Sequence, residues 1–150
     1  MSTTDEAMTA ALALAREAAD AGEIPVGAVV LSASGERLGA GRNRREETTD
    51  PTAHAEVVAL REAALATGSW NLSGTTLVVT MEPCVMCAGA ILQSRVSRVV
   101  FGAWDDKAGA AGSLYDVLRD RRLPHRAEVI CGVREDEAIS LLRDFFEARR

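Results

Sequence analysis

The sequence contains no apolar run that approaches the length of a membrane-spanning helix, which needs about 20 residues. It also contains no internal repeat, no low-complexity tract and no linker long enough to divide the chain. These absences argue against membrane-spanning and repeat architectures, and they predict one domain over residues 1–150 with one hydrophobic core. The composition, 47% hydrophobic and 26% charged, is that of an ordinary globular protein.

Cysteine is scarce, and an odd number, three, argues against a disulfide framework. Cys84 and Cys87 are three positions apart, which is typical of metal binding or catalysis in a reducing compartment. Cys131 lies in an apolar stretch, residues 127–133, and is predicted to be a small buried side chain. The first six residues are polar and acidic, unlike a secretory signal, so we expect a cytoplasmic protein with no membrane partner.

Positive charge is also limited, and the net charge of −5 does not by itself indicate nucleic-acid binding. The charges are unevenly distributed: residues 1–25 contain one arginine and five acids, whereas residues 95–126 contain seven basic residues and four aspartates. This pattern fits a basic face on an acidic protein, and it fits charges on a solvated surface equally well.

Hydrophobic periodicity and turn residues predict alternating helices and strands. Helices or helical turns are predicted at 7–21, 51–67, 83–92, 113–118 and from 135 to the C-terminus. Strands are predicted at 24–31, 37–41, 75–80, 96–101 and 127–131. Asp50 is a favourable N-cap and Pro51 a favourable first helical residue. A hairpin followed by helix–strand alternation predicts an α/β fold, with a mixed sheet and helices on both faces.

The most informative pattern is His54-Ala-Glu56, followed about thirty residues later by Pro83-Cys84-Val-Met-Cys87. One imidazole and two thiols supply three zinc ligands and leave the fourth position open, as in catalytic zinc sites, where water bound to the ion has a pKa of about 7. Both motifs are predicted at helix starts, where free N–H groups and the helix dipole favour thiolates. Glu56 is turned about the helix away from His54, so we predict that it transfers protons instead of binding the ion.

Other uses of these residues are less well supported. A Cys-x-x-Cys pair is also found in redox sites and in structural zinc sites. A structural site needs a fourth ligand, and only Cys131 or His125 remain to supply it, neither with a partner at a suitable spacing. We therefore expect His125 to be structural or to lie near the substrate.

Longer segments add a resemblance to a known family. The His-x-Glu and Pro-Cys-x-x-Cys motifs resemble the signature of zinc nucleobase deaminases. Cytosine, guanine, deoxycytidylate and riboflavin-pathway deaminases share them. The chain between residues 23 and 146 is similar to the bacterial tRNA-specific adenosine deaminases in four segments: Asp50–Glu56, Thr80–Ala90, Val99–Ala103 and Lys107–Ser113. The last two segments narrow the resemblance to the tRNA enzymes.

The resemblance implies a three-layer α/β/α, cytidine deaminase-like fold with a five-stranded mixed sheet, and a homodimer. It implies one zinc ion per chain on His54, Cys84 and Cys87, with Glu56 as the proton shuttle. The implied reaction is hydrolytic deamination of the wobble adenosine to inosine in a tRNA anticodon stem-loop, with release of ammonia. Two alternatives remain: a deaminase of free guanine or cytosine, and a non-catalytic, zinc-stabilised RNA-binding subunit, which would be expected to lack the carboxylate of Glu56.

The resemblance also implies substrate contacts away from the zinc. Asn43 would bind the flipped nucleoside, although in isolation it fits a turn residue equally well. Asp105 and Lys107 would lie near flanking nucleotides, and Phe146 with the Arg149-Arg150 end would border the anticodon loop. Two further expectations come from the aromatic residues. Adjacent residues diverge by about 100° on a helix, so one of Phe145 and Phe146 is expected in the core and the other at the RNA or a partner. Trp104 either stacks on a base or packs within the fold.

Overall fold

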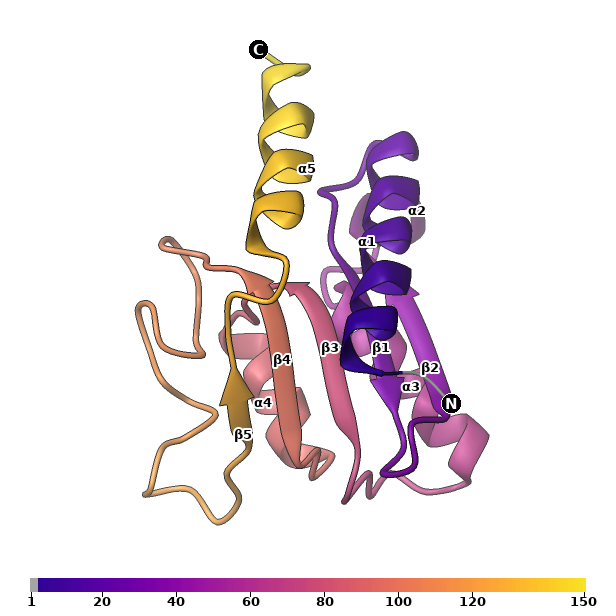
Figure 1. Ribbon diagram of the computed structural model, residues 1–150, viewed down its shortest axis with the longest axis vertical. Helices are drawn as coiled ribbons and strands as arrows, with labels where there is room; N and C mark the ends of the chain where they lie inside the picture. Colours follow the sequence, from indigo (N-terminus) through magenta and orange to yellow (C-terminus); the bar gives the residue numbers. More distant parts are fainter. Residues whose placement is uncertain (1–2) are drawn as a thin grey trace.

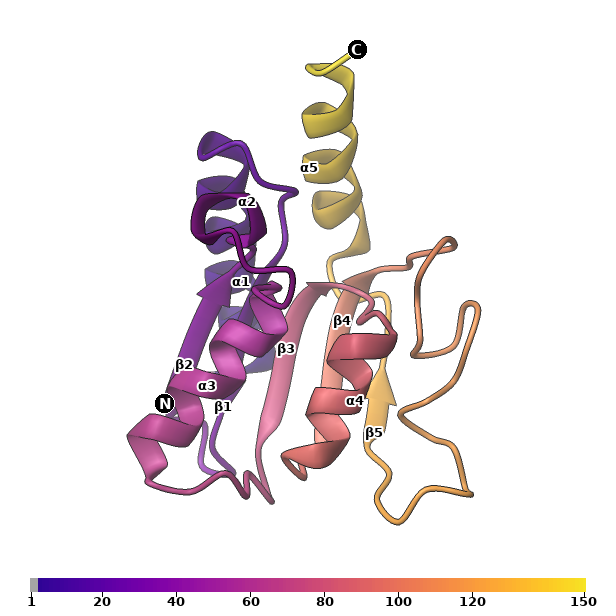
Figure 2. The ribbon, with the colours of Figure 1, turned by 180° about the vertical axis from the view of Figure 1, so that it is seen from behind.

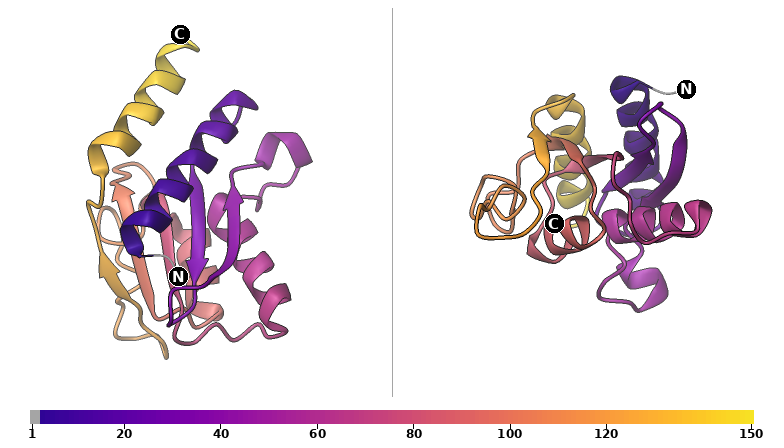
Figure 3. Two further views of the ribbon diagram at one scale, coloured as in Figure 1. Left: turned by 45° about the vertical axis from the view of Figure 1, so that its right-hand side comes forward. Right: turned by 90° about the horizontal axis from the view of Figure 1, so that it is seen from below.

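The computed structural model describes residues 3–150, so Met1 and Ser2 of the polar N-terminal segment lie outside the described residues. Five strands form one mixed sheet in the order β2-β1-β3-β4-β5 (Figure 1). Helices α1 and α5 cover one face and helices α3 and α4 the other (Figures 1 and 2). Seen from below, the sheet runs between the two helical layers (Figure 3). The predicted three-layer α/β/α fold is therefore confirmed.

The directions of the strands place four carboxyl ends at one edge of the sheet. Their bounds are β1 Gly27–Leu31, β2 Arg37–Arg42, β3 Thr76–Met81, β4 Arg98–Ala103 and β5 Glu128–Ile130. Strand β1 is antiparallel to both β2 and β3, whereas β3, β4 and β5 are parallel to one another. Strands β2, β3, β4 and β5 therefore all run in one direction, opposite to that of β1. Their carboxyl ends lie at the same edge of the sheet. Residues that directly follow these strands gather there, as ligand sites do in α/β sheets.

The helices are α1 Thr4–Asp20, α2 Arg45–Thr48, α3 Ala55–Thr67, α4 Val85–Gln93 and α5 Glu135–Glu147. Helix α1 begins three residues before the predicted start because the hydroxyl of Thr3 accepts the N–H of Glu6 at 3.1 Å and caps the helix. The short helix α2 was not predicted from the sequence. The carboxylate of Glu23 accepts the N–H groups of Glu46 and Glu47 at 3.0 and 2.7 Å, and this long-range contact holds α2 in place.

The three central strands, β1, β3 and β4, are buried on both faces of the sheet. Alternate residues of each central strand enter different core layers. Val79 and Phe101 pack towards α3 and α4, whereas Val78 and Val100 pack towards α1 and α5. The two layers fix both pairs of helices on the sheet, so the helix ends are held in register with the carboxyl ends of the strands.

Two helix predictions were wrong. Helix α3 starts at Ala55 and not at residue 51, because the carboxylate of Asp50 accepts both the N–H and the hydroxyl of Thr52, at 2.8 and 2.7 Å, and forms a turn. Residues 113–118 are not helical. Gly112 has φ of +134°, and the N–H of Ser113 donates to the distant Glu82.

Cys131 is exposed, which contradicts its predicted burial. It directly follows β5, which ends at Ile130 at the edge of the sheet, and Gly132 with φ of +75° then turns the chain away. An edge strand is covered on one side only, so an apolar sequence around it did not ensure burial. Within residues 3–150, no helix combines the length and apolar character needed to cross a membrane.

Candidate active site

A cavity of about 500 Å³ opens at the edge where the parallel strands end. Its size lies within the range of about 300–1,000 Å³ that small-molecule sites occupy. Three connections contribute its polar wall: Asn43 follows β2, Cys84 follows β3, and Asp105 follows β4. Antiparallel β1 lies between β2 and β3, so β2, β3 and β4 end at the same edge. Side chains about 20 to 60 residues apart in the sequence therefore meet because of strand direction and not because of their spacing.

His54, Cys84 and Cys87 form a compact group of metal-binding atoms, all within 4.8 Å of one another. His54 Nδ1 lies 3.6 Å from Cys84 Sγ and 3.5 Å from Cys87 Sγ. A tetrahedral zinc with bonds of about 2.3 Å to sulfur and about 2.0–2.1 Å to nitrogen separates such atoms by about 3.6 Å. The three side chains therefore fit zinc in both chemistry and spacing, and they leave a fourth position towards the cavity, which His54 and Cys84 line.

Two helix N-termini meet at this group. His54 is the N-cap of α3 and Cys84 is the N-cap of α4, while Cys87 lies in the first turn of α4. The sequence had placed His54 and Cys84 inside the helices. At the cap position the backbone is extended, so each side chain projects beyond the end of its helix, where free N–H groups favour an anion.

The three side chains shift one another's pKa values. A hydrogen bond from the Cys87 thiol, with another from His54, holds the pKa of Cys84 at about 4. The same hydrogen bond and burial raise the pKa of Cys87, so this thiol keeps its proton. The hydrogen bond to Cys84 also raises the pKa of His54. Because zinc requires thiolate ligands, its binding would release the proton of Cys87.

Glu56 lies in the first turn of α3 and lines the same cavity, although it is only 4% exposed. Burial raises the pKa of Glu56 to about 7. A carboxyl group with such a pKa accepts and donates protons near neutral pH. Its position two residues after His54 places it beside the metal-binding group.

Asn43 forms the wall that follows β2. Its Oδ1 accepts the N–H of Arg45 at 3.1 Å, and its Nδ2 donates to the carbonyl of Ile24 at 3.4 Å. These contacts fix the orientation of the amide and leave one Nδ2–H for a ligand in the cavity. Asn43 therefore both stabilises a turn and lines the cavity.

The opposite wall is the segment after β4, which includes Asp105 and Lys107. The carboxylate of Asp105 accepts the N–H groups of Lys107 and Ala108, both at 3.1 Å, and closes a tight turn. Trp104 lines the cavity and packs edge-to-face on Phe101 with ring centroids 4.9 Å apart. The structure thus supports packing for Trp104 while leaving part of its ring at the cavity.

Helix α5 completes the cavity. Phe145 is buried, whereas Phe146 is 51% exposed and lines the cavity together with Leu142. The expectation that the two adjacent rings separate between core and surface is confirmed. His125 lies elsewhere: its Nε2 contacts the carbonyl of Val96 at 2.9 Å, which is a structural contact.

The sequence reasoning overlooked Glu82. This residue lines the cavity, yet its carboxylate is almost fully buried. The available signal was a lone acid between a buried strand and the Pro83-Cys84 motif. In such a place an ionised side chain needs several hydrogen-bond partners.

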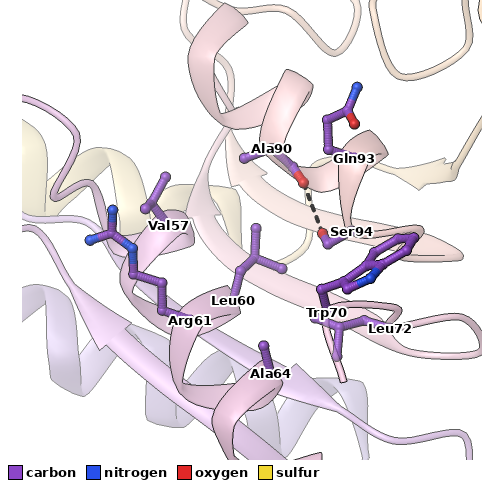
Figure 4. A pocket seen from close by; sticks show the side chains of 9 residues that line it. All are labelled: Val57, Leu60, Arg61, Ala64, Trp70, Leu72, Ala90, Gln93 and Ser94. Atoms are coloured by element: carbon purple, nitrogen blue, oxygen red, sulfur yellow. Dashed lines mark hydrogen bonds between the residues drawn. The ribbon is translucent and has the colours of Figure 1, made fainter. Parts of the chain in front are cut away.

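A second hollow of about 320 Å³ lies on the outer side of α3 and α4 (Figure 4). Leu60, Arg61 and Ala64 of α3 face Ala90 and Gln93 of α4 across it, and the ring of Trp70 stands at one end. The lining is mostly apolar, and Arg61 is its one ionisable side chain. This groove therefore lacks the groups that a reaction site needs.

Known proteins are similar to this chain over most of its length. The family profile described as the cytidine and deoxycytidylate deaminase zinc-binding region matches residues 1–103. The chain is 46% identical to the tRNA-specific adenosine deaminase of Bacillus subtilis, over 95% of this chain and 88% of that protein. It is 54% identical to part of the tRNA(Ile)-lysidine synthase of Deinococcus radiodurans, and here it spans only 25% of the relative's length.

Solved structures of deaminases are also similar to this chain. A tRNA:A34 deaminase that performs A-to-I editing at the wobble position superposes with a TM-score of 0.87 at 39% identity, covering 91% of this chain and 98% of that one. The guanine deaminase of Nitrosomonas europaea superposes with a TM-score of 0.81 at 30% identity, covering 97% of this chain and 85% of that one.

Proposed function

This chain belongs to the zinc-binding cytidine and deoxycytidylate deaminase family, and we propose that it deaminates the wobble adenosine of a tRNA anticodon to inosine. The observation that carries the reaction class is the meeting of His54, Cys84 and Glu56 in one cavity. The substrate assignment is supported by the deaminase relatives, of which this chain covers nearly the whole length. The proposed site lies within a single deaminase domain.

His54, Cys84 and Cys87 would hold one zinc ion, which supplies an activated water when bound. Glu56 would then move two protons: it would carry the first from the water to a ring nitrogen of the base, and the second from the oxygen that becomes the carbonyl of inosine to the amino group, which leaves as ammonia. The raised pKa of Glu56, about 7, suits a group that both accepts and donates a proton. Its burial keeps bulk water from competing for the proton.

The remaining residues orient the substrate. Asn43 offers the free Nδ2–H of its fixed amide to the nucleoside. Asp105 and Lys107 face the neighbouring nucleotides from the opposite wall, and Phe146 borders the anticodon loop together with the C-terminal arginines. The exposed part of the Trp104 ring provides a further surface on which a base can stack. An anticodon loop already exposes its bases, so extruding the wobble adenosine costs less than extruding a base from a duplex.

The enzyme acts in the cytoplasm, where tRNA is found, and it is a homodimer. We assign the dimer interface to the apolar groove between α3 and α4, whose lining is shown in Figure 4. Trp70 at this groove is 64% exposed, and exposed large apolar side chains often mark interaction surfaces.

Ammonia release from matched substrates tests this function. The zinc-loaded protein is incubated with an anticodon stem-loop that contains a wobble adenosine, with the same stem-loop that contains a wobble cytidine, and with free guanine and cytosine. Ammonia and inosine are expected from the first RNA alone. Release from free guanine alone would instead support the second candidate, which the similarity to a guanine deaminase favours. Zinc binding with no ammonia from any substrate would indicate a non-catalytic RNA-binding subunit.

A further inference from the structure

The carboxylate of Glu82 is a buried group for which the catalytic steps above provide no role. The residue is 3% exposed and lies between the end of β3 and the metal-binding Cys84. Its Oε1 accepts the N–H of Asp105 at 2.9 Å and the hydroxyl of Ser113. Its Oε2 accepts the N–H groups of Ala111 and Ser113 at 2.9 and 3.0 Å. Four donors, all from the segment after β4, thus converge on one side chain.

These donors come from both ends of residues 105–113, which we call the β4 loop. The loop closes on Glu82 and on the neighbouring backbone, since the N–H of Ala110 donates to the carbonyl of Pro83 at 2.8 Å. Its middle lies directly against the carboxylate. A Cβ atom on Gly109 would come within 2.3 Å of the Cδ atom of Glu82, so only glycine allows this approach. The loop contains no helix, so Glu82 replaces the partners that regular secondary structure would provide.

The anchored segment is also a wall of the active site. Asp105 and Lys107, the two residues proposed to face flanking nucleotides, both lie in the β4 loop and line the cavity. The anchor itself is two residues before Cys84 on the chain. One carboxylate therefore links the wall that would contact RNA to the start of the helix that would bind zinc. Four hydrogen bonds on one side chain restrain the loop at this link.

We propose that Glu82 is a positioning residue: it fixes the β4 loop relative to the metal-binding helix and thereby sets how tightly the substrate RNA binds. The identity of the substrate in this inference rests on the proposed function. The hydrogen bonds between Glu82 and the β4 loop do not depend on it. Glu82 touches no reacting atom, so its loss weakens binding of the RNA and leaves the chemical step largely intact.

The substitution Glu82→Gln tests the inference because it keeps the size of the side chain but turns one acceptor into a donor. Two of the four donors then face an NH₂ group and lose their partner. The KM for the wobble-adenosine stem-loop is expected to rise by about 10- to 100-fold, as a misplaced binding wall would cause, while kcat changes much less. Zinc content should stay at one ion per chain, measured by atomic absorption.

Ser113→Ala provides a milder second variant, which removes only the hydroxyl donor and is expected to raise KM by a smaller factor. Leu12→Ala is the matched control for lost stability. Leu12 belongs to α1 and is buried against the other face of the sheet, so this variant should lower the melting temperature without changing KM. Hydrogen exchange gives a readout without substrate: the amides of residues 105–113 should exchange faster in Glu82→Gln than in the wild type or in Leu12→Ala.

An unchanged KM together with unchanged exchange in residues 105–113 would overturn the inference. Loss of zinc from Glu82→Gln would also overturn it, since Glu82 would then support the metal ligands and not the RNA wall. If the wild-type protein releases no ammonia from the stem-loop, the proposed function fails separately, and the exchange measurement alone decides whether Glu82 anchors the loop.

Discussion

Glu56 and Glu62 lie on the same helix, α3, but in opposite environments. Glu56 is buried at the cavity, where burial raises its pKa to about 7, and Glu62 is exposed to solvent. A proton shuttle requires the first environment, because a carboxyl in water is fully ionised at neutral pH and returns protons poorly. The two residues therefore form a matched pair for testing the catalytic role.

Glu56→Gln is expected to reduce ammonia release by about 10²- to 10⁴-fold, the usual contribution of a general acid–base group. Zinc content should not change, because Glu56 is not one of the three ligands that fit the ion. Glu62→Gln should retain wild-type activity. Single-turnover deamination of the stem-loop, together with zinc analysis, measures both effects. Turnover by Glu56→Gln at the wild-type rate would rule out the assigned role.

Cys87 and Cys131 form a second pair, one fully buried behind the cavity and one exposed at the end of β5. Cys87→Ser is expected to weaken zinc binding, whereas Cys131→Ser should bind the ion as the wild type does. A ligand that binds only the folded protein stabilises it, by about 2.7 kcal/mol at a hundredfold excess over Kd. Zinc should therefore raise the melting temperature of the wild type and of Cys131→Ser, but much less that of Cys87→Ser. A similar rise in all three proteins would show that Cys87 is not a ligand.

The fit between α3 and β2 determines where His54 and Glu56 stand. Gly41 of β2 touches the backbone of the first turn of α3: a Cβ atom there would lie 2.7 Å from the carbonyl oxygen of Ala55 and 2.8 Å from the nitrogen of Ala59. Backbone atoms of a packed helix cannot move aside as flexible side chains do. A side chain at Gly41 would therefore displace the end of α3 that holds the candidate ligand.

Gly41→Ala is expected to destabilise the protein by about 1–3 kcal/mol through overpacking. The opposite sign is expected for Gly89→Ala in α4, where nothing lies within 4 Å of the added Cβ atom. There the alanine should add about 0.5–1 kcal/mol, because glycine is the poorer residue in a helix interior. Urea denaturation of the three proteins measures both differences. A stable Gly41→Ala protein with normal zinc affinity would contradict the close approach.

At the scale of the whole molecule, acidic net charge and RNA binding have to coexist. Several arginines of the segment 95–126 form local ion pairs, such as Arg119 with Asp116 and Arg122 with Asp120, at 3.0 and 2.7 Å. These contacts support the solvated-surface alternative for much of that segment. RNA recognition would then depend on the few residues at the cavity and not on a broad basic face.

The homodimer proposal is also tested at this scale. Trp70→Glu places a charge in the apolar groove between α3 and α4 and is expected to convert dimers into monomers. Ile139→Glu is the control, because Ile139 is an exposed apolar residue of α5, on the other side of the sheet. Light scattering coupled to gel filtration gives the masses. A monomeric wild type, or a dimer that both variants preserve, would exclude the groove as the interface.

The amino-acid sequence by itself determined the chemistry and most of the secondary structure. Residue types and spacing in His54-x-Glu56 and Cys84-x-x-Cys87 predicted a donor set whose observed separations fit zinc. Apolar runs identified the three central strands, β1, β3 and β4, because burial of a strand on both faces requires such runs. The prediction of secondary structure failed where one local sequence pattern is compatible with two conformations. Asp50 can cap a helix or close a turn, and its actual choice moved the start of α3 to Ala55.

Only the tertiary structure decided which distant residues share the cavity. Asn43, Cys84 and Asp105 meet because β2, β3 and β4 end at one edge, a consequence of strand direction that no local pattern contains. The role of Glu82 likewise depends on donors 23 to 31 residues away, so no periodicity or motif could indicate it. A carboxylate that is buried pays for its lost hydration with long-range hydrogen bonds, and these exist only once the chain has folded.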